Sequence, residues 1–176
     1  MDKNRFELRL LCEKDADRML EWLHNEDVTK YLQLNGKNLI KSDAVNFIIA
    51  AQNIEKDLHF AIVNEVDEYQ GTVSLKNINP AEGSAEYAIS MHPSAVGNGA
   101  SRAGTELILQ VAFEQRGLDF VYLNVLEENQ RAVRFYEKLG FTYQNTTNIT
   151  FRGEDKKLLW YQMKRASDLR RCDNCD

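Results

Sequence analysis

A run of small residues, Gly97 to Ser101, is the first candidate for chemistry, because it lies between a predicted strand and a predicted helix. A helix start exposes unpaired backbone N–H groups and the positive end of the helix dipole. Small side chains let phosphate oxygens approach those N–H groups closely. The run can therefore bind a pyrophosphate, although an isolated Gly-x-Gly is more often a flexible turn. It is not a dinucleotide-binding fingerprint, since Arg102 stands where that pattern needs a third glycine.

A phenol follows at Tyr136, on a second predicted helix that starts at Asn129 and ends at Gly140. Tyrosine has an ordinary pKa of about 10 and a thiol one of about 8.5, so a phenol stays protonated at neutral pH and can donate a proton to a departing thiolate. The alternative is that Tyr136 is a core aromatic residue beside Phe135. Asn129 suits the N-cap of this helix.

The elements that position these residues follow from the spacing of apolar side chains. Strands are expected at 6–10, 59–63, 71–75, 85–91 and 120–126, from 141 onward and at about 158–163. Helices are expected at 16–23, 28–32, after a cap at Ser42, at 102–116 and at 129–139. A meander followed by alternating strands and helices predicts a mixed α/β sheet flanked by helices, not a doubly wound one.

Composition limits the class of protein. The chain has 176 residues, of which 43% are hydrophobic and 28% charged, as expected for one globular domain. A net charge of −5 without a basic run argues against nucleic-acid binding. No apolar run approaches the roughly 20 residues that span a bilayer, and the N-terminus lacks the apolar core of a signal peptide. Three cysteines without the spacing of a disulfide framework indicate a reduced, cytoplasmic protein.

The C-terminal tail is predicted to lie outside the domain. We expect a domain over residues 1–165 and a polar, disordered tail over 166–176. Cys172 and Cys175 have no second pair to complete a zinc site, so we interpret them as incidental. No arrangement of histidines, cysteines and carboxylates predicts a metal.

The segment from Glu86 to Phe141 resembles the GNAT acyltransferases. Within that superfamily it is most similar to the branch that acetylates ribosomal and other protein N-termini, polyamines and amino sugars. The family's phosphate loop, Gln/Arg-x-x-Gly-x-Gly/Ala, falls on Val96, Gly97, Asn98, Gly99, Ala100 and Ser101. Its later signature is matched by Asn129, Ala132, Phe135, Tyr136, Lys138, Leu139, Gly140 and Phe141. The likeness extends over residues 5–164.

Two residues depart from the loop pattern. Val96 replaces a side chain that donates to phosphate, and Ser101 replaces the final glycine or alanine. Backbone amides carry most of such a cradle, and Arg102 is near enough to supply a cation.

The resemblance implies a mostly antiparallel, splayed sheet and acetyl-coenzyme A as co-substrate, without a metal. The strand 86–91 would part from the strand 120–126, and backbone groups around Ile89 and Met91 would bind the pantetheine arm together with Asn129. Tyr136 would be the general acid. Glu86 would accept the amine's proton through a water, although it suits an exposed strand position equally well. His59 is a second candidate base, and His24 and His92 are weaker ones.

The acceptor pocket is implied to involve Trp22, Asn25, Glu26 and Tyr31, although aromatic residues at helical spacing are more often core. We expect transfer of an acetyl group to a primary amine of a small molecule, an amino sugar ahead of a polyamine. A protein N-terminal acetyltransferase and a non-catalytic acyl-coenzyme A-binding domain are the alternatives. A homodimer is left open because family members often form one.

Overall fold

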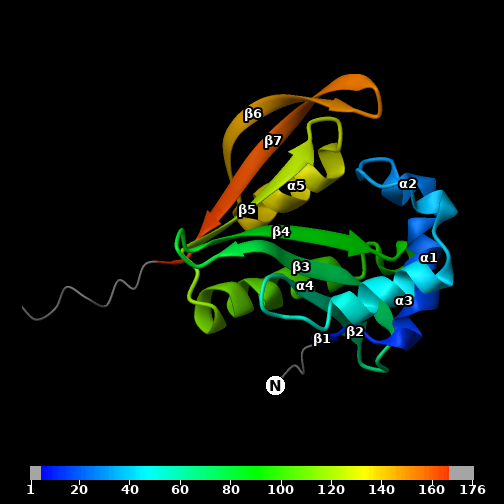
Figure 1. Ribbon diagram of the computed structural model, residues 1–176. Helices are drawn as coiled ribbons and strands as arrows, with labels where there is room; N and C mark the ends of the chain where they lie inside the picture. Colours follow the sequence, from blue (N-terminus) through cyan, green and yellow to red (C-terminus); the bar gives the residue numbers. More distant parts are fainter. Residues whose placement is uncertain (1–4, 167–176) are drawn as a thin grey trace, which may run out of the picture.

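The computed structural model describes residues 5–166, which form one seven-stranded sheet in the order β1-β2-β3-β4-β5-β7-β6 (Figure 1). The strands are β1 (Phe6–Leu10), β2 (Leu58–Asn64), β3 (Tyr69–Asn79), β4 (Ser84–Met91), β5 (Phe120–Leu126), β6 (Thr142–Phe151) and β7 (Glu154–Lys164). The helices are α1 (Ala16–Leu23), α2 (Glu26–Thr29), α3 (Lys41–Ala50), α4 (Ala100–Gln110) and α5 (Gln130–Leu139). Every strand pair except β4 with β5 is antiparallel, which confirms the predicted fold class.

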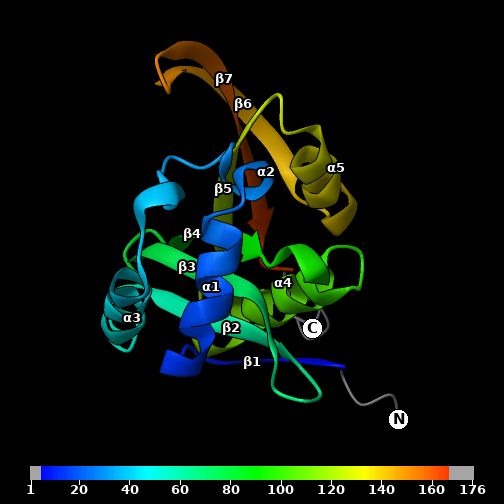
Figure 2. The same cartoon turned by 90° about the vertical axis from the view of Figure 1, so that its right-hand side faces the viewer.

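Helices cover both faces of the N-terminal half of the sheet (Figures 1 and 2). On one face α1 and α3 share a core with Ala61 and Val63 of β2. On the opposite face α4 packs over a second, larger core that includes Ile62 of the same strand. Successive residues of a strand point to opposite faces, so β2 contributes apolar side chains to both cores.

Helix α4 lies close to β2 because Gly104 has no side chain. A Cβ atom at this position would lie 2.3 Å from Cδ1 of Ile62. The helix runs on into a π-helical turn, Val111–Gln115, so the predicted helix is one continuous segment. The helix that follows the small-residue run is therefore packed directly on the sheet.

The sheet parts between β4 and β5. These strands pair only at Ser84–Glu86 with Phe120–Tyr122, and the rest of β4 has no partner on that side among residues 5–166. Strand β5 instead pairs with β7 along its whole length. The layer of β5, β7 and β6 therefore turns away from β4, as Figure 1 shows.

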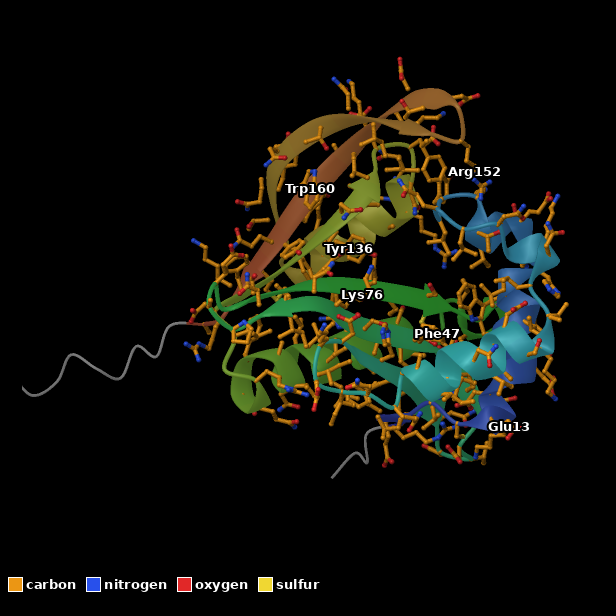
Figure 3. The ribbon with its side chains drawn as sticks, in the orientation of Figure 1. Glu13, Phe47, Lys76, Tyr136, Arg152 and Trp160 are labelled. Atoms are coloured by element: carbon orange, nitrogen blue, oxygen red, sulfur yellow. The ribbon has the colours of Figure 1, made fainter. Side chains whose placement is uncertain are left out.

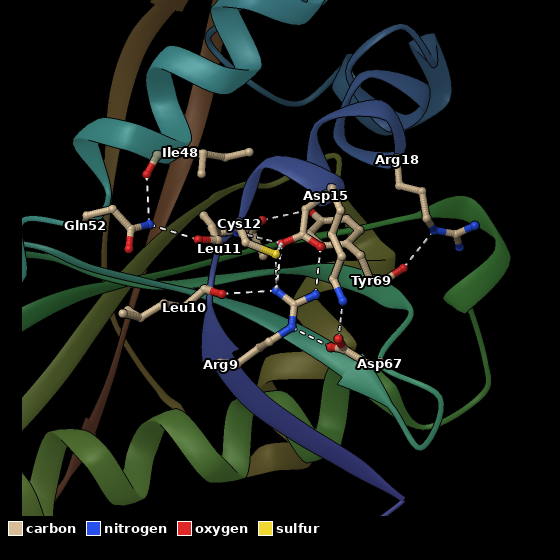
Figure 4. Close-up of polar contacts among 12 residues, drawn as sticks. Arg9, Leu10, Leu11, Cys12, Asp15, Arg18, Ile48, Gln52, Asp67 and Tyr69 are labelled. Atoms are coloured by element: carbon tan, nitrogen blue, oxygen red, sulfur yellow. Dashed lines mark hydrogen bonds and ion pairs between the residues drawn. The ribbon is translucent and has the colours of Figure 1, made fainter.

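A buried carboxylate holds β1 to the turn that leads into α1 (Figure 4). Asp15 is 2% exposed and accepts two hydrogen bonds of 2.8 Å from the Arg9 guanidinium and one of 2.9 Å from the Cys12 N–H. Arg9 also pairs with Asp67 between β2 and β3. Burial raises the pKa of Asp15, but the hydrogen bonds from Arg9 and Cys12 outweigh burial and leave that pKa below its ordinary value.

The prediction that Ser42 caps the third helix is wrong. Helix α3 begins at Lys41, and the N–H of Ile40 donates to Oδ2 of Asp43 at 2.8 Å. Ile40 is therefore the N-cap residue, a first-turn carboxylate satisfies its N–H group, and Ser42 lies inside the first turn of the helix.

The predicted tail falls outside the described residues from position 167 onward, and so do Cys172 and Cys175. None of the helices within residues 5–166 combines the length and the apolar character needed to cross a bilayer.

Candidate active site

A cleft of about 940 Å³ opens where β4 leaves β5. Strand β4 forms one wall, and the end of β5 with the start of α5 forms the other. The loop after α2 and the hairpin of β6 and β7 contribute Tyr31, Leu32, Ile149 and Phe151 at one end. The loop before α4 contributes Val96 and Gly97 at the other end, and the first turn of α4 contributes Ser101. The two sequence motifs therefore meet in one cavity.

The edge of β4 that faces the cleft presents main-chain hydrogen-bonding groups. The His92 N–H donates to the Gln70 carbonyl at 2.8 Å and so continues the ladder between β3 and β4. Bonded and non-bonded pairs alternate along an antiparallel ladder. Ser90 therefore bonds toward β3, whereas Ile89 and Met91 direct their N–H and C=O groups into the gap. This is the edge that the resemblance assigns to pantetheine.

The start of α4 leaves four backbone N–H groups without an acceptor among the described residues. Val96 donates to Pro93, and Asn98 donates to Ala95. The Ala100 N–H donates to Oδ1 of Asn98 at 2.9 Å. The N–H groups that remain unpaired in this part of the chain are those of Gly97, Gly99, Ser101 and Arg102. Such a group of free donors at a helix start suits an anion.

Two glycines shape this loop. Gly97 and Gly99 have φ values of +82° and +94°, which residues with a side chain rarely adopt. A Cβ atom on Gly97 would meet no atom within 4 Å, so the backbone there is open to an approaching group. A phosphate can therefore reach the N–H groups without displacing protein atoms.

Two polar side chains near the start of α4, those of Asn98 and Arg102, are engaged within the protein, whereas the Ser101 hydroxyl lines the cleft without a partner among the described residues. Asn98 donates to Oε1 of Gln70 at 3.0 Å, and Nε of Arg102 donates to Glu106 at 2.9 Å. Val96 is 49% exposed at the rim of the cleft and offers no donor from its side chain. The donors available at this end are thus main-chain N–H groups and the Ser101 hydroxyl.

Tyr136 projects from α5 into the cleft from a cage of aromatic rings. Its ring contacts Tyr87 and Phe141 edge-on, with centroid distances of 6.0 and 5.8 Å, and packs beside Phe135. The Tyr136 hydroxyl has no hydrogen-bond partner among residues 5–166. Every fully buried side-chain oxygen in this part of the chain does have a partner, so this hydroxyl is not fully buried and reaches the cleft surface. Burial of the ring raises the pKa of Tyr136 to about 12. The phenol is therefore a fixed, protonated donor at neutral pH.

Asn129 serves as the N-cap of α5 and also lines the cleft. Its Oδ1 accepts from the Ala132 N–H at 3.3 Å. The Nδ2 group has no acceptor among the described residues. The structure shows the cap that the sequence predicted, and it leaves the Nδ2 group available to donate into the cleft.

Glu86 lies at the point where β4 and β5 part. Its Oε1 is 3.0 Å from Nζ of Lys76, and its Oε2 accepts from Asn77 at 2.9 Å. Both carboxylate oxygens are therefore engaged. Glu86 and Lys76 together place a neutral ion pair on the cleft wall.

The histidines have structural partners outside the cleft lining. His59 lies against Phe47 of α3 and bonds to Ser74 at 2.7 Å, and burial lowers its pKa. His92 lies 2.6 Å from a carboxylate oxygen of Glu21, and His24 bonds to a backbone carbonyl.

The structure separates the four residues predicted on the acceptor side. Tyr31 lines the cleft, and Glu26 lines an adjoining hollow. Asn25 caps α2 by accepting from the Asp27 N–H. Trp22 is buried in the core and donates to the Tyr69 hydroxyl at 3.0 Å, which is the core alternative that the sequence left open.

Several lining residues carry no signal in the sequence. Lys76 and Asn124 reach the cleft only through strand pairing, and Phe151 reaches it through the final hairpin. Arg131 lies between two motif positions, Asn129 and Ala132, and the motif could have indicated it.

A sheet that parts beside a helix start with free N–H groups is the arrangement that the resemblance to the GNAT acyltransferases implied. The chain belongs to the GNAT acetyltransferase family, because the profile of the Acetyltransferase (GNAT) domain matches residues 5–142. This match confirms the family that the motifs predicted.

Curated relatives share part of the chain. A spermidine N(1)-acetyltransferase of Escherichia coli (strain K12) is 34% identical over 77 residues, which are 44% of this chain and 41% of that protein. A mycothiol acetyltransferase of Salinispora tropica is 33% identical over 99 residues, 56% of this chain and 29% of the relative. The aligned stretch thus spans less than half of either relative.

Solved structures share the fold over nearly the whole chain. A Vibrio cholerae spermidine N-acetyltransferase, crystallised with CoA and spermine, superimposes with a TM-score of 0.82 at 21% identity. The superposition covers 92% of this chain and 96% of that one.

Proposed function

We propose that this protein transfers the acetyl group of acetyl-coenzyme A to a primary amine of a small molecule. The observation that carries the proposal is the parting of β4 from β5 beside a helix start with four unpaired N–H groups. The relatives support it, since their names specify spermidine and mycothiol acetyltransferases and one structure contains CoA and spermine.

Binding would fix the thioester relative to the amine. The N–H groups of Gly97, Gly99, Ser101 and Arg102 would hold the pyrophosphate, and the free edge at Ile89 and Met91 would hold pantetheine. A positioned encounter of this kind replaces a bimolecular one and lowers the barrier. An N–H of the same edge would stabilise the oxyanion that forms on the thioester carbonyl.

Tyr136 would donate to the sulfur as the carbon–sulfur bond breaks. Its pKa is about 12. Complete proton transfer to a thiolate with an ordinary pKa of about 8.5 would be uphill by ~5 kcal/mol. Low-polarity surroundings raise a thiol's pKa as well and narrow that difference. The hydroxyl therefore acts first as a hydrogen-bond donor to the developing thiolate.

Glu86 would assist removal of the proton from the attacking amine. Since Lys76 and Asn77 occupy both of its oxygens, it would act through a water at the parting of the strands. The nitrogen forms the new carbon–nitrogen bond as the carbon–sulfur bond breaks. The amine proton passes through the water to solvent, and the thiolate, stabilised by the Tyr136 hydroxyl, takes up a proton from solvent and leaves as the free thiol.

The charge of the cleft favours an amino sugar over a polyamine. Three carboxylates, from Asp27, Glu86 and Glu128, line the cleft together with three cations, from Lys30, Lys76 and Arg131. A polyamine, which carries a charge on every nitrogen, gains no net attraction from such a lining. An amino sugar presents one amine and several hydroxyl groups to the same mixed set of donors and acceptors.

Release of free thiol from acetyl-coenzyme A, measured across a panel of acceptors, tests the proposal. We expect turnover with glucosamine or a nucleotide-linked amino sugar, less with spermidine and least with a peptide N-terminus. A peptide preference would establish the protein acetyltransferase alternative. Tight calorimetric binding of acetyl-coenzyme A without turnover on any amine would establish a non-catalytic domain.

A further inference from the structure

Arg152 joins the tip of the final hairpin to the loop after α2. Its Nη2 donates to the carbonyl oxygens of Thr29, Leu32 and Leu34 at 3.0, 3.3 and 3.4 Å. Thr29 is the last residue of α2, where the negative end of the helix dipole favours a cation. Figure 3 shows Arg152 at this junction of hairpin and loop.

The turn that carries Arg152 would favour another residue. Arg152 and Gly153 have positive φ values of 51° and 83°, the signs that a type I′ turn has in a two-residue hairpin. Such turns prefer Asn-Gly, and an arginine in the left-handed region is strained. The strain is compatible with a stable fold because the guanidinium binds three carbonyls and lies over the Phe151 ring at 5.5 Å. Arginine at position 152 is therefore explained by its contacts with the three carbonyls and not by the preference of the turn.

The joined segments are opposite walls of the acceptor end. Tyr31 and Leu32 line the cleft from the loop, and Ile149 and Phe151 line it from the hairpin. Arg152 itself faces an adjoining hollow of about 710 Å³, which shares Lys30, Gln33 and Phe151 with the cleft. Beyond this contact the hairpin is an extension of the sheet in which β6 pairs only with β7 among residues 5–166.

We infer that Arg152 is a specificity-determining positioning residue that fixes the spacing of the acceptor-side walls and so restricts the site to compact amines. The inference rests on the proposed function. With Arg152 in place, the cleft and the hollow remain separate spaces on either side of Phe151. Without it the hairpin can move from the loop, the two spaces can merge, and a larger acceptor such as a peptide N-terminus can enter.

The variant Arg152→Asn separates this role from folding, because asparagine suits the turn and cannot reach the three carbonyls. We expect the KM for a small amine to rise about tenfold. We also expect the ratio of kcat/KM for a peptide to kcat/KM for the small amine to rise. The Kd for acetyl-coenzyme A, which contacts the opposite end, should change less than twofold. Arg152→Lys, which keeps the charge and N–H donors but lacks the planar guanidinium that lies over Phe151, should give an intermediate KM. The matched control is Arg116→Asn, since Arg116 also donates from Nη2 to a backbone carbonyl, at 2.9 Å, outside the cleft lining.

Hydrogen–deuterium exchange provides a readout that does not need activity. In Arg152→Asn, exchange should accelerate at residues 29–34 and 149–153 and stay unchanged elsewhere, with an unchanged melting temperature. If Arg152→Asn exchanged at both segments as slowly as the wild type, or kept the wild-type acceptor preference, the inference would be overturned. A wild-type protein that transfers no acetyl group would refute the proposed function, whereas the exchange experiment would still decide whether Arg152 holds the two walls.

Discussion

Substitution of Tyr136 by phenylalanine is the sharpest test of the chemistry, because it removes one oxygen and leaves the ring in place. The ring is held by Tyr87, Phe135 and Phe141, and its hydroxyl has no partner among the described residues. Removal of an unpartnered hydroxyl should change the free energy of unfolding by less than about 0.5 kcal/mol. Any large loss of activity therefore reports on the reaction.

The expected loss in kcat is about 10²- to 10⁴-fold, the usual contribution of a positioned acid. This corresponds to about 3–5 kcal/mol of transition-state stabilisation. The Kd for acetyl-coenzyme A should stay within about twofold, because the pyrophosphate donors lie at the other end of the cleft. With a pKa of about 12, Tyr136 keeps its proton below that pH, so a loss of activity between pH 8 and 10 would come from another group.

Tyr161→Phe is the matched control. Burial, with a hydrogen bond to Glu137, raises the pKa of Tyr161 to about 12 as well, but this residue does not line the cleft. Its substitution should lower the unfolding free energy by about 1–2 kcal/mol and leave kcat unchanged. Pre-steady-state thiol release, measured with both variants, shows whether the rate of the chemical step depends on the hydroxyl in the cleft or on the loss of any buried tyrosine hydroxyl. If Tyr136→Phe kept more than half of the wild-type rate, or lost turnover and cofactor binding in parallel, the phenol would have no role as acid.

Three further predictions concern the fold and the cofactor end. Asp15→Asn should lower the unfolding free energy by about 1–3 kcal/mol at pH 7. Because the folded pKa of Asp15 lies below its ordinary value, its contribution is present above about pH 4 and is lost as pH falls through the folded pKa, so urea unfolding of variant and wild type should converge at low pH. Gly97→Val should lower the unfolding free energy by about 1–2 kcal/mol, since φ there is +82°, and should weaken calorimetric binding of acetyl-coenzyme A at least tenfold; unchanged binding would exclude a phosphate at this loop. Asn129→Ala should remove about 1 kcal/mol of helix capping and also raise the KM for acetyl-coenzyme A, and a loss of stability alone would assign Asn129 to the cap only.

Local features of the fold were predictable because they depend on neighbours in the sequence. Apolar residues at a spacing of two or of three to four located the strands and helices, and each prediction fell within a few residues of the observed element. The prediction of a cap at Ser42 failed for an equally local reason, since the helix begins at Lys41 and places Ser42 inside its first turn. The family was predictable from two motifs that place a glycine loop and a tyrosine at helix positions.

Contacts between distant segments were not predictable in this way. Trp22 has a helical spacing that suits either a core or a pocket, and only the packing of α1 on β2 and β3 placed it in the core. Glu86 has an ordinary strand position, and only the register of β3 with β4 showed that Lys76 lies opposite it. Arg152 contacts residues more than a hundred positions earlier, and no local pattern marks it.

Local sequence was enough to predict the order of the elements, the helix start after the glycine loop and the phenol on α5, because each depends on side chains within one or two helical turns. Long-range packing was needed to show which strand edge stays unpaired, which carboxylate is already engaged and which arginine joins the final hairpin to the loop after α2. Those outcomes depend on the register of the strands and on the packing of the helices over two cores. Both involve residues far apart in the sequence, so they follow from the free energy of the whole fold and not from any one segment.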